Sequence, residues 1–262
     1  MADFMNNNII EIYSSRHKNK LTQNFSNIPK VERDNVDYII IDMWDTYRDL
    51  GEIYFKNAKI AVDSFHVIKH LNEAIVSIRL KIMRKFDKRT KSLMANDMYY
   101  YMLKKFHYFF TKNFEDIYSG QIEIRKYRTK WDKYEIRRYL MSIDPDLNYA
   151  YHLKEKYREF NLTASYESCD EELNELIDDF RNSHLEEFRT FGKLLNRWKI
   201  NIKNSFIRIN GKRLSNGPME GINSRIKTMM KSANGFRNFN RFRNRVIYSI
   251  NKNVPIKGTP KK

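Results

Sequence analysis

Two short apolar runs restrict the fold of this chain more than any other feature. Residues 38–41 (YIII) and 59–62 (KIAV) are rich in β-branched side chains and too short for a helical core. We therefore expect buried strands near 38–42 and 59–63. The segments that follow them, about 44–55 and 64–86, repeat their apolar residues at helical spacing. This strand–helix–strand–helix order predicts a parallel strand pair with helical crossovers.

The rest of the chain is expected to be mainly helical. Residues 9–13 (IIEIY) predict one more short strand, but from residue 87 onward Tyr- and Phe-rich segments with helical periodicity replace the strand pattern. The overall prediction is an α/β fold interrupted by a large all-helical insertion. The expected divisions are a first part of the core at 1–86, the insertion at 87–206, two C-terminal helices at 207–250, and a disordered basic tail at 251–262.

An aspartate stands at the end of each of the two predicted strands. In open α/β sheets the ligand site lies outside the carboxyl ends of the strands, so Asp42 and Asp63 are expected to face one crevice. A second interpretation is that each aspartate only caps the helix that follows it. The sequence pattern leaves both roles open.

Basic charge is concentrated at the C-terminal end. The chain has 49 basic and 32 acidic residues, and its last 75 positions hold 19 of the basic residues but only one acidic residue, Glu220. Such a surface predicts a phosphate-backbone partner, and an anionic membrane is disfavoured because no strongly amphipathic terminal helix is present. Glu220 follows Pro218 at the expected start of a helix, where a carboxylate within a positive field suits a metal ligand held against a polyanion.

The residues after Glu220 place further basic side chains at helical spacing. Arg237, Arg241 and Arg245 recur every four positions, an arrangement of like charges that destabilises an isolated helix and so indicates a polyanionic partner. The alternative is a solvated helix face. The residues predicted to contact DNA are Lys227, Lys231, Arg237, Arg241, Arg243 and Arg245.

Several functional classes are excluded by composition. A single cysteine, Cys169, allows neither a disulfide framework nor a multi-cysteine zinc site. With eight glycines in all, the chain has no phosphate loop and no dinucleotide-binding fingerprint. It also lacks a run of about 18 apolar residues and a signal-peptide pattern, so we expect a cytoplasmic protein with no membrane partner.

Three segments in the same order resemble bacterial DDE insertion-sequence transposases of the ISL-three family. They are residues 41–74, 215–223 and 235–239, and the resemblance covers about residues 8–250. It implies a ribonuclease-H-like fold with a helical insertion, and DNA transposition by strand cleavage and strand transfer. It also implies a divalent metal cofactor, Mg²⁺ or Mn²⁺. The implied partners are transposon-end DNA, target DNA and a second copy or a full-length transposase, and the implied location is the bacterial nucleoid.

The resemblance assigns roles to four residues. Asp42 resembles the second metal-binding catalytic acid of the family and Glu220 the third, while Asp63 and His66 match an Asp-x-x-His signature that accompanies them. His66 is expected to face phosphate, to bond to Asp63, or to be a core histidine. A zinc site formed with His70 is disfavoured because no glutamate adjoins His66 and no cysteine partner is present.

One part of the family pattern is missing. Relatives carry an N-terminal zinc-binding segment, a helix-turn-helix and a strand that ends in the first catalytic aspartate, whereas Asp3 follows no apolar run. We therefore expect an incomplete ribonuclease-H-like core, with strands near 9–13, 38–42 and 59–63, in a truncated copy that is inactive alone. The alternatives are a non-catalytic DNA-binding remnant that modulates a full-length transposase, and an RNA-binding helical protein.

Overall fold

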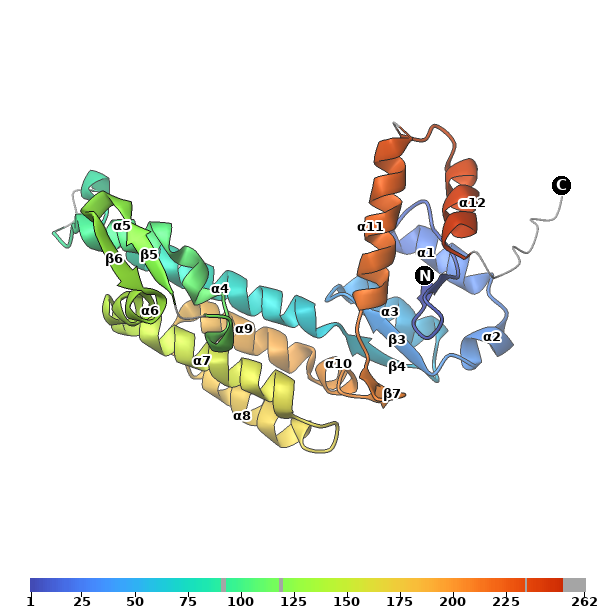
Figure 1. Cartoon of the computed structure of the whole chain (residues 1–262). Helices are drawn as coiled ribbons and strands as arrows, with labels where there is room; N and C mark the ends of the chain where they lie inside the picture. The colour runs from blue at the N-terminus through green and yellow to red at the C-terminus, as the bar shows by residue number, and fades with distance from the viewer. Residues whose placement is uncertain (91–92, 118–119, 234, 252–262) are drawn as a thin grey trace. The chain divides into compact units, whose positions relative to one another are not determined.

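The computed structural model describes residues 1–90, 93–117, 120–233 and 235–251 (Figure 1). Its contacts divide the chain into two compact units. One unit comprises Met1–Asp63 and Arg208–Lys262, and the other comprises Ser64–Ile207. Most of the predicted disordered tail, residues 252–262, lies outside the described residues.

The first unit combines small sheets with helices. Strands β3 and β4 pair in parallel, with Ile41 opposite Val62, so the predicted parallel pair is confirmed. The predicted strand at 9–13 is wrong beyond Ile9, because Ile10 and Glu11 both donate backbone hydrogen bonds to the Met1 carbonyl rather than joining a ladder. The elements of this unit are β1 (Ala2–Asp3), β2 (Asn8–Ile9), α1 (Lys18–Ser26), α2 (Lys30–Asp34), β3 (Tyr38–Ile41), α3 (Asp45–Tyr54), β4 (Lys59–Val62), β7 (Arg208–Ile209), β8 (Lys212–Arg213), α11 (Gly217–Ser232) and α12 (Phe239–Ile250).

Every sheet in the described part of the chain has two strands. The fold class is therefore mixed α/β with small sheets. Helix α3 packs on the parallel pair. The two approach closely at Gly51, which has no Cβ; a Cβ there would lie 2.7 Å from Cδ1 of Ile60. The side chains of Ala61 and Val62 are fully buried, as expected for a strand covered by other elements.

An apolar cluster joins the N-terminal hairpin to the two C-terminal helices. Its buried members are Ile9 of β2, Ile222 of α11, and Val246 and Ile247 of α12. Asn251 fixes this contact, because its Oδ1 accepts from the Ile9 N–H at 2.8 Å and its Nδ2 donates to the Ile9 carbonyl at 2.7 Å. Asn251 is thus an ordered, buried residue, although it was assigned to the tail.

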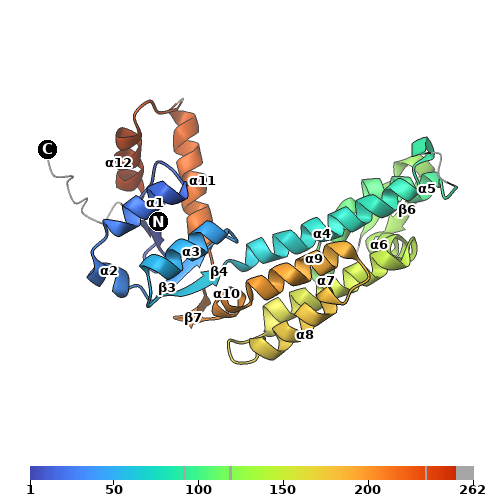
Figure 2. The same ribbon diagram turned by 180° about the vertical axis from the view of Figure 1, so that it is seen from behind.

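The second unit is a helical body in which α4, α7, α8 and α9 lie side by side (Figure 2). Aromatic rings fill its core, with Phe180 4.9 Å from Phe191 and 5.1 Å from Phe188 between ring centroids. The helices are α4 (Ser64–Lys85), α5 (Asp97–Lys105), α6 (Lys133–Ser142), α7 (Pro145–Thr163), α8 (Cys169–Arg181), α9 (Glu186–Arg197) and α10 (Lys199–Asn204), with short 3-10 turns at Lys88–Thr90, His107–Phe110, Phe114–Asp116 and Arg125–Tyr127.

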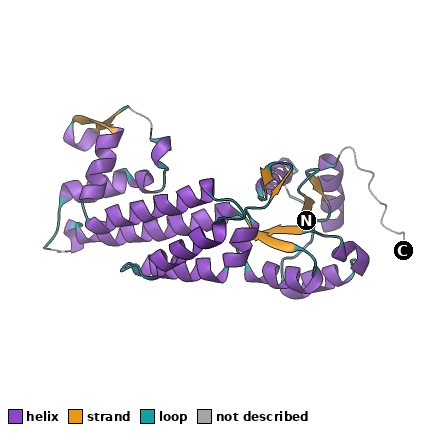
Figure 3. Cartoon of the chain, turned by 90° about the horizontal axis from the view of Figure 1, so that it is seen from below, coloured by secondary structure: helices purple, strands orange, loops and turns teal. Residues whose placement is uncertain are grey.

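The insertion is not all-helical, which corrects the sequence prediction. Strands β5 (Gln121–Ile124) and β6 (Thr129–Asp132) form an antiparallel hairpin before α6, and Figure 3 distinguishes such strands from the surrounding helices. Ile122 and Ile124 alternate with polar residues at the period of a strand, and burial of Ile124 in the helical unit favours the strand pairing.

The division into units also differs from the expected one. Helix α4 belongs to the helical unit, whereas the sequence division at residue 86 placed it with the first part of the core. None of the described helices is both long and apolar enough to cross a membrane.

Candidate active site

The two strand-end aspartates lie at one edge of the parallel pair. Asp42 directly follows β3 and Asp63 directly follows β4, and the Asp63 N–H donates to the Ile41 carbonyl at 3.0 Å. Asp63 is buried, with 3 % of its surface exposed, whereas Asp42 is half-buried. The carboxyl edge of the pair therefore carries one enclosed and one accessible carboxylate.

Asn216 links both aspartates to the start of α11. Its side-chain Nδ2 donates to Asp42 Oδ1 at 2.8 Å, and its backbone N–H donates to Asp63 Oδ2 at 2.9 Å. Asn216 is the N-cap residue of α11, but its side chain does not cap that helix. An asparagine at the N-cap usually accepts a hydrogen bond from a backbone N–H of the first helical turn. Here the Asn216 side chain is bonded to Asp42 instead.

This link brings the Glu220 helix to the strand ends. The Glu220 N–H donates to the Asn216 carbonyl at 3.0 Å, so the two residues are one helical turn apart, a rise of about 6 Å. Residues four apart share a face of a helix, and Glu220 is exposed in the first turn of α11. Glu220 therefore lies one turn after Asn216 on the same face of the helix, and Asn216 is the residue that is bonded to Asp42.

Aromatic residues adjoin the accessible carboxylate. The rings of Trp44 and Tyr47 meet edge to face with centroids 4.5 Å apart, and the Arg16 guanidinium lies 5.7 Å from the Trp44 ring centre. Burial, together with the Asp42 charge, raises the pKa of Tyr47. The Tyr47 hydroxyl thus stays protonated near Asp42 at neutral pH.

The donor chemistry at the site suits a hard divalent cation. Mg²⁺ binds through one or two carboxylates and keeps water in the remaining positions, and Asp42 and Glu220 provide carboxylate oxygens. Across the residues that the structure describes, no three His, Cys, Asp or Glu side chains are grouped so as to hold one metal ion. Asp42 and Glu220 therefore do not form a closed cage with a third such side chain of the described residues.

The contact division assigns His66 to the helical unit, whereas Asp42, Asp63 and Glu220 belong to the other unit. His66 is in the first turn of α4, and its ring centroid is 5.6 Å from that of Phe65. His70, the residue considered as a zinc partner, has its Nδ1 3.2 Å from Oε2 of Glu73.

The predicted basic stripe is divided between two environments. Helix α12 begins at Phe239, so Arg241 and Arg245 lie on it, whereas Arg237 precedes it. All three are exposed, and the Arg245 guanidinium lies 5.9 Å from the Phe236 ring centre. Arg243 differs because its guanidinium binds the Glu11 carboxylate through Nε and Nη2.

Helix α11 presents the other predicted cations. Lys227 and Lys231 are exposed, and so is Arg225, which the sequence analysis did not assign to the site. A break separates α11 from the basic helix α12, since α11 ends at Ser232 and Gly235 has a φ of 91°.

Comparison with known proteins supports one family. A family model described as a transposase, the DDE transposases of the ISL-three type, matches residues 1–246. No curated protein and no solved structure gives a significant match. The match covers nearly the whole chain, and the chain therefore belongs to the ISL-three family of DDE transposases.

Proposed function

We propose that the chain acts in DNA transposition, by metal-dependent strand cleavage and strand transfer, with Asp42 and Glu220 as metal-binding acids. The observation that carries this proposal is the double link from Asn216 to Asp42 and Asp63, which spans 174 and 153 positions of sequence. It ties the Glu220 helix to the strand ends. Asp42 and Glu220 would hold a divalent ion there, which would supply an activated oxygen nucleophile and stabilise the leaving oxygen.

The chain's own residues have distinct roles in this proposal. Asp42 has its Oδ1 engaged by Asn216, which fixes the position of the carboxylate that would bind the cation. Asp63 is a positioning residue, because its Oδ2 accepts from the backbone at the start of α11 and its side chain is buried. Glu220 is exposed and is carried by the helix that this bond holds.

The exposed cations of α11 and α12 position the DNA backbone. Lys227, Lys231, Arg241 and Arg245 are solvent-exposed, as required for phosphate contacts that fix register without reading sequence. Arg243 contributes indirectly, since its bond to Glu11 attaches α12 to the N-terminal segment. DNA at transposon ends and at the target, within the bacterial nucleoid, is the proposed partner.

Cleavage by the 262-residue chain alone is expected to be absent or very slow. No third potential ligand is grouped with Asp42 and Glu220 in the described residues. Loss of one positioned charge stabiliser costs on the order of 10²–10³ in rate. Asp45, the nearest further acid along the chain, is bound to Arg48 at 3.0 Å.

A chimera tests the proposal. The chain joined to the preceding part of a full-length ISL-three transposase should cut the terminal DNA of its element in Mg²⁺ or Mn²⁺. Glu220→Gln should abolish that cleavage, whereas Glu52→Gln, an exposed glutamate of α3, should leave it intact. Cleavage that survives Glu220→Gln would refute the assignment. DNA binding without cleavage in the chimera would instead favour a non-catalytic protein that modulates a full-length transposase.

A further inference from the structure

The β5–β6 hairpin of the helical unit has one packed face and one exposed face. Ile122 lies opposite Trp131, and Ile124 lies opposite Thr129, so these four residues share a face of the ribbon. Ile124 is fully buried there, and the Trp131 ring centroid is 5.1 Å from that of Tyr139 on α6. The opposite face carries the polar residues of the two strands.

The ribbon is clamped at its base. Asp132 accepts hydrogen bonds from the Gly120 N–H at 3.1 Å and from the Tyr134 N–H at 2.7 Å, and its own N–H donates to Glu135 Oε2 at 2.8 Å. The bond to Glu135 is part of the capping box of α6, and the bond from Tyr134 caps the same helix. A two-stranded ribbon is at best marginally stable by itself, so these bonds and the packed face hold it in place.

Four cations lie within six residues at the tip of the ribbon. Lys126 is bonded to Asp97 at 2.6 Å, so part of its charge is neutralised. Arg125 lies 3.9 Å from Glu123 with 89 % of its side chain exposed, which makes a weak pair. Arg128 and Lys130 are exposed, and the described residues include no ion-pair partner for either of them.

The backbone conformation of Arg128 supports a role for its side chain in binding a partner. Its φ is 51°, in the left-handed region that glycine and asparagine adopt most easily. An arginine there carries a backbone cost that no ion pair with a described residue offsets. Such outliers collect at functional sites.

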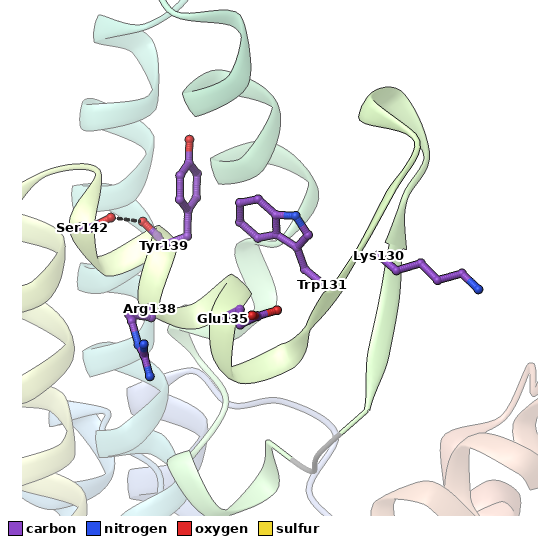
Figure 4. Close-up of a pocket in the computed structure, with 6 residues that line it drawn as sticks. All are labelled: Lys130, Trp131, Glu135, Arg138, Tyr139 and Ser142. Atoms are coloured by element: carbon purple, nitrogen blue, oxygen red, sulfur yellow. Dashed lines mark hydrogen bonds between the residues drawn. The ribbon is translucent and has the colours of Figure 1, made fainter.

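A shallow cavity of about 530 Å³ lies between the ribbon and α6 (Figure 4). A second cavity of about 440 Å³ shares Arg138 and Ser142 with it. Lys130 and Trp131 point to opposite sides of β6 in Figure 4, so the lysine ammonium is directed away from the packed face. The exposed Arg138 extends the basic surface from the ribbon onto α6.

We propose that the β5–β6 ribbon is a second contact for duplex DNA, with Arg125, Arg128 and Lys130 against backbone phosphates. This inference rests on the proposed function and adds a contact remote in sequence from the basic C-terminal helices. The major groove of B-DNA admits a two-stranded ribbon. An acidic protein partner fits less well, because the aromatic residue Trp131 is on the packed face, whereas protein interfaces are enriched in aromatic residues and depleted of lysine.

Salt-dependent binding by the full chain is the first test. Replacing Arg125, Arg128 and Lys130 together by Ala should reduce the log–log salt slope for duplex binding by about three, roughly one per lost phosphate contact. The charge-matched control replaces three lysines of the same unit that are paired with Glu187, Asp179 and Asp170. These are Lys81, Lys156 and Lys203, and their substitution should change the slope by less than about one.

Arg128→Gly separates binding from folding. Glycine relieves the left-handed backbone, so the melting temperature should stay the same or rise, while the salt slope falls by about one. A purely structural arginine would give the reverse, with a lower melting temperature and an unchanged slope.

The outcomes separate this proposal from the proposed function. If the chain binds DNA and Arg241→Ala lowers the slope but the ribbon triple does not, the ribbon proposal fails alone, and an acidic protein segment becomes its expected partner. If the unsubstituted chain does not bind duplex DNA at all, the proposed function and the ribbon proposal both fail.

A cross-link gives a direct readout. Cys169 is the chain's single cysteine and is buried, so Glu123→Cys, opposite Lys130 on the exposed face, would introduce one accessible thiol on the ribbon. That thiol should form a disulfide with thiol-tethered duplex DNA, whereas Thr190→Cys, at an exposed threonine of α9, should not. Equal cross-linking at both positions would overturn the proposal.

Discussion

Replacing Asp63 by alanine should loosen the start of α11 while leaving β4 in place. Asp63 is 3 % exposed, and its Oδ2 accepts from the Asn216 N–H at 2.9 Å. A donor left without its partner in such a site costs about 1–3 kcal/mol. The first turn of α11, which carries Glu220, should therefore open about 5- to 150-fold more often.

Hydrogen exchange at the Asn216 amide measures this opening directly. A local readout is needed because a chain of two units does not unfold as one two-state system. Asp63→Asn is the matched control, since its side-chain oxygen still accepts from Asn216 and should preserve protection to within about threefold. Wild-type protection in Asp63→Ala, or an equal loss in Asp63→Asn, would refute the positioning role.

Four other perturbations test separate parts of the structure. Replacing Arg241 and Arg245 by Ala should lower the salt slope of DNA binding by about two. Arg243→Ala should instead leave the slope unchanged. It should release the N-terminal segment from α12, which faster hydrogen exchange at Ile9 would measure. Burial alone would raise the pKa of Glu11, but the hydrogen bond from Arg243 and the nearby positive charges lower it overall. This contact should therefore stabilise the fold at neutral pH and be lost as the pH falls below about 4.3; pH-dependent exchange at Ile9 checks this, and Glu11→Gln should remove the dependence. A Cβ at Gly192 would lie 2.8 Å from the Arg181 backbone nitrogen, so Gly192→Ala should cost about 1–3 kcal/mol in chemical denaturation of the helical unit.

The parallel strand pair could be predicted because its signal is local. Each strand is a short β-branched run that ends in an aspartate, and a helix of predictable periodicity separates the two. The position of Asp42 and Asp63 at one edge follows directly from parallel pairing. The turn between β7 and β8 also has a local signal, because Asn210-Gly211, with φ values of 50° and 77°, is a dipeptide typical of hairpin turns.

The link made by Asn216 could not be predicted in the same way. Asn216 stands before Gly217 and Pro218, which indicates a helix start, but its bonds reach back 153 and 174 positions. Periodicity carries no information over such separations. The pairing of Arg243 with Glu11 spans 232 positions, so the spacing of the basic residues alone suggested a DNA contact.

The β5–β6 hairpin was missed because tertiary packing decides its conformation. Its strands are four residues each, next to the Tyr- and Arg-rich helix α6, and a helical reading extends through both. The packing of Ile124 and Trp131 against the helical unit favours the strand pairing. In short segments that fit both helical and strand periodicity, such packing outweighs the local conformational preference of the residues.

Mn²⁺ binding, measured by electron paramagnetic resonance, tests the central claim most directly. The claim is that Asp42 and Glu220 hold the metal, while Asp63 holds the helix. The 262-residue chain should bind Mn²⁺. Asp42→Asn and Glu220→Gln should each weaken that binding at least about tenfold, or about 1.4 kcal/mol. Asp63→Asn should leave the binding unchanged. Binding that withstands both Asp42→Asn and Glu220→Gln, or that is lost in Asp63→Asn, would contradict the account.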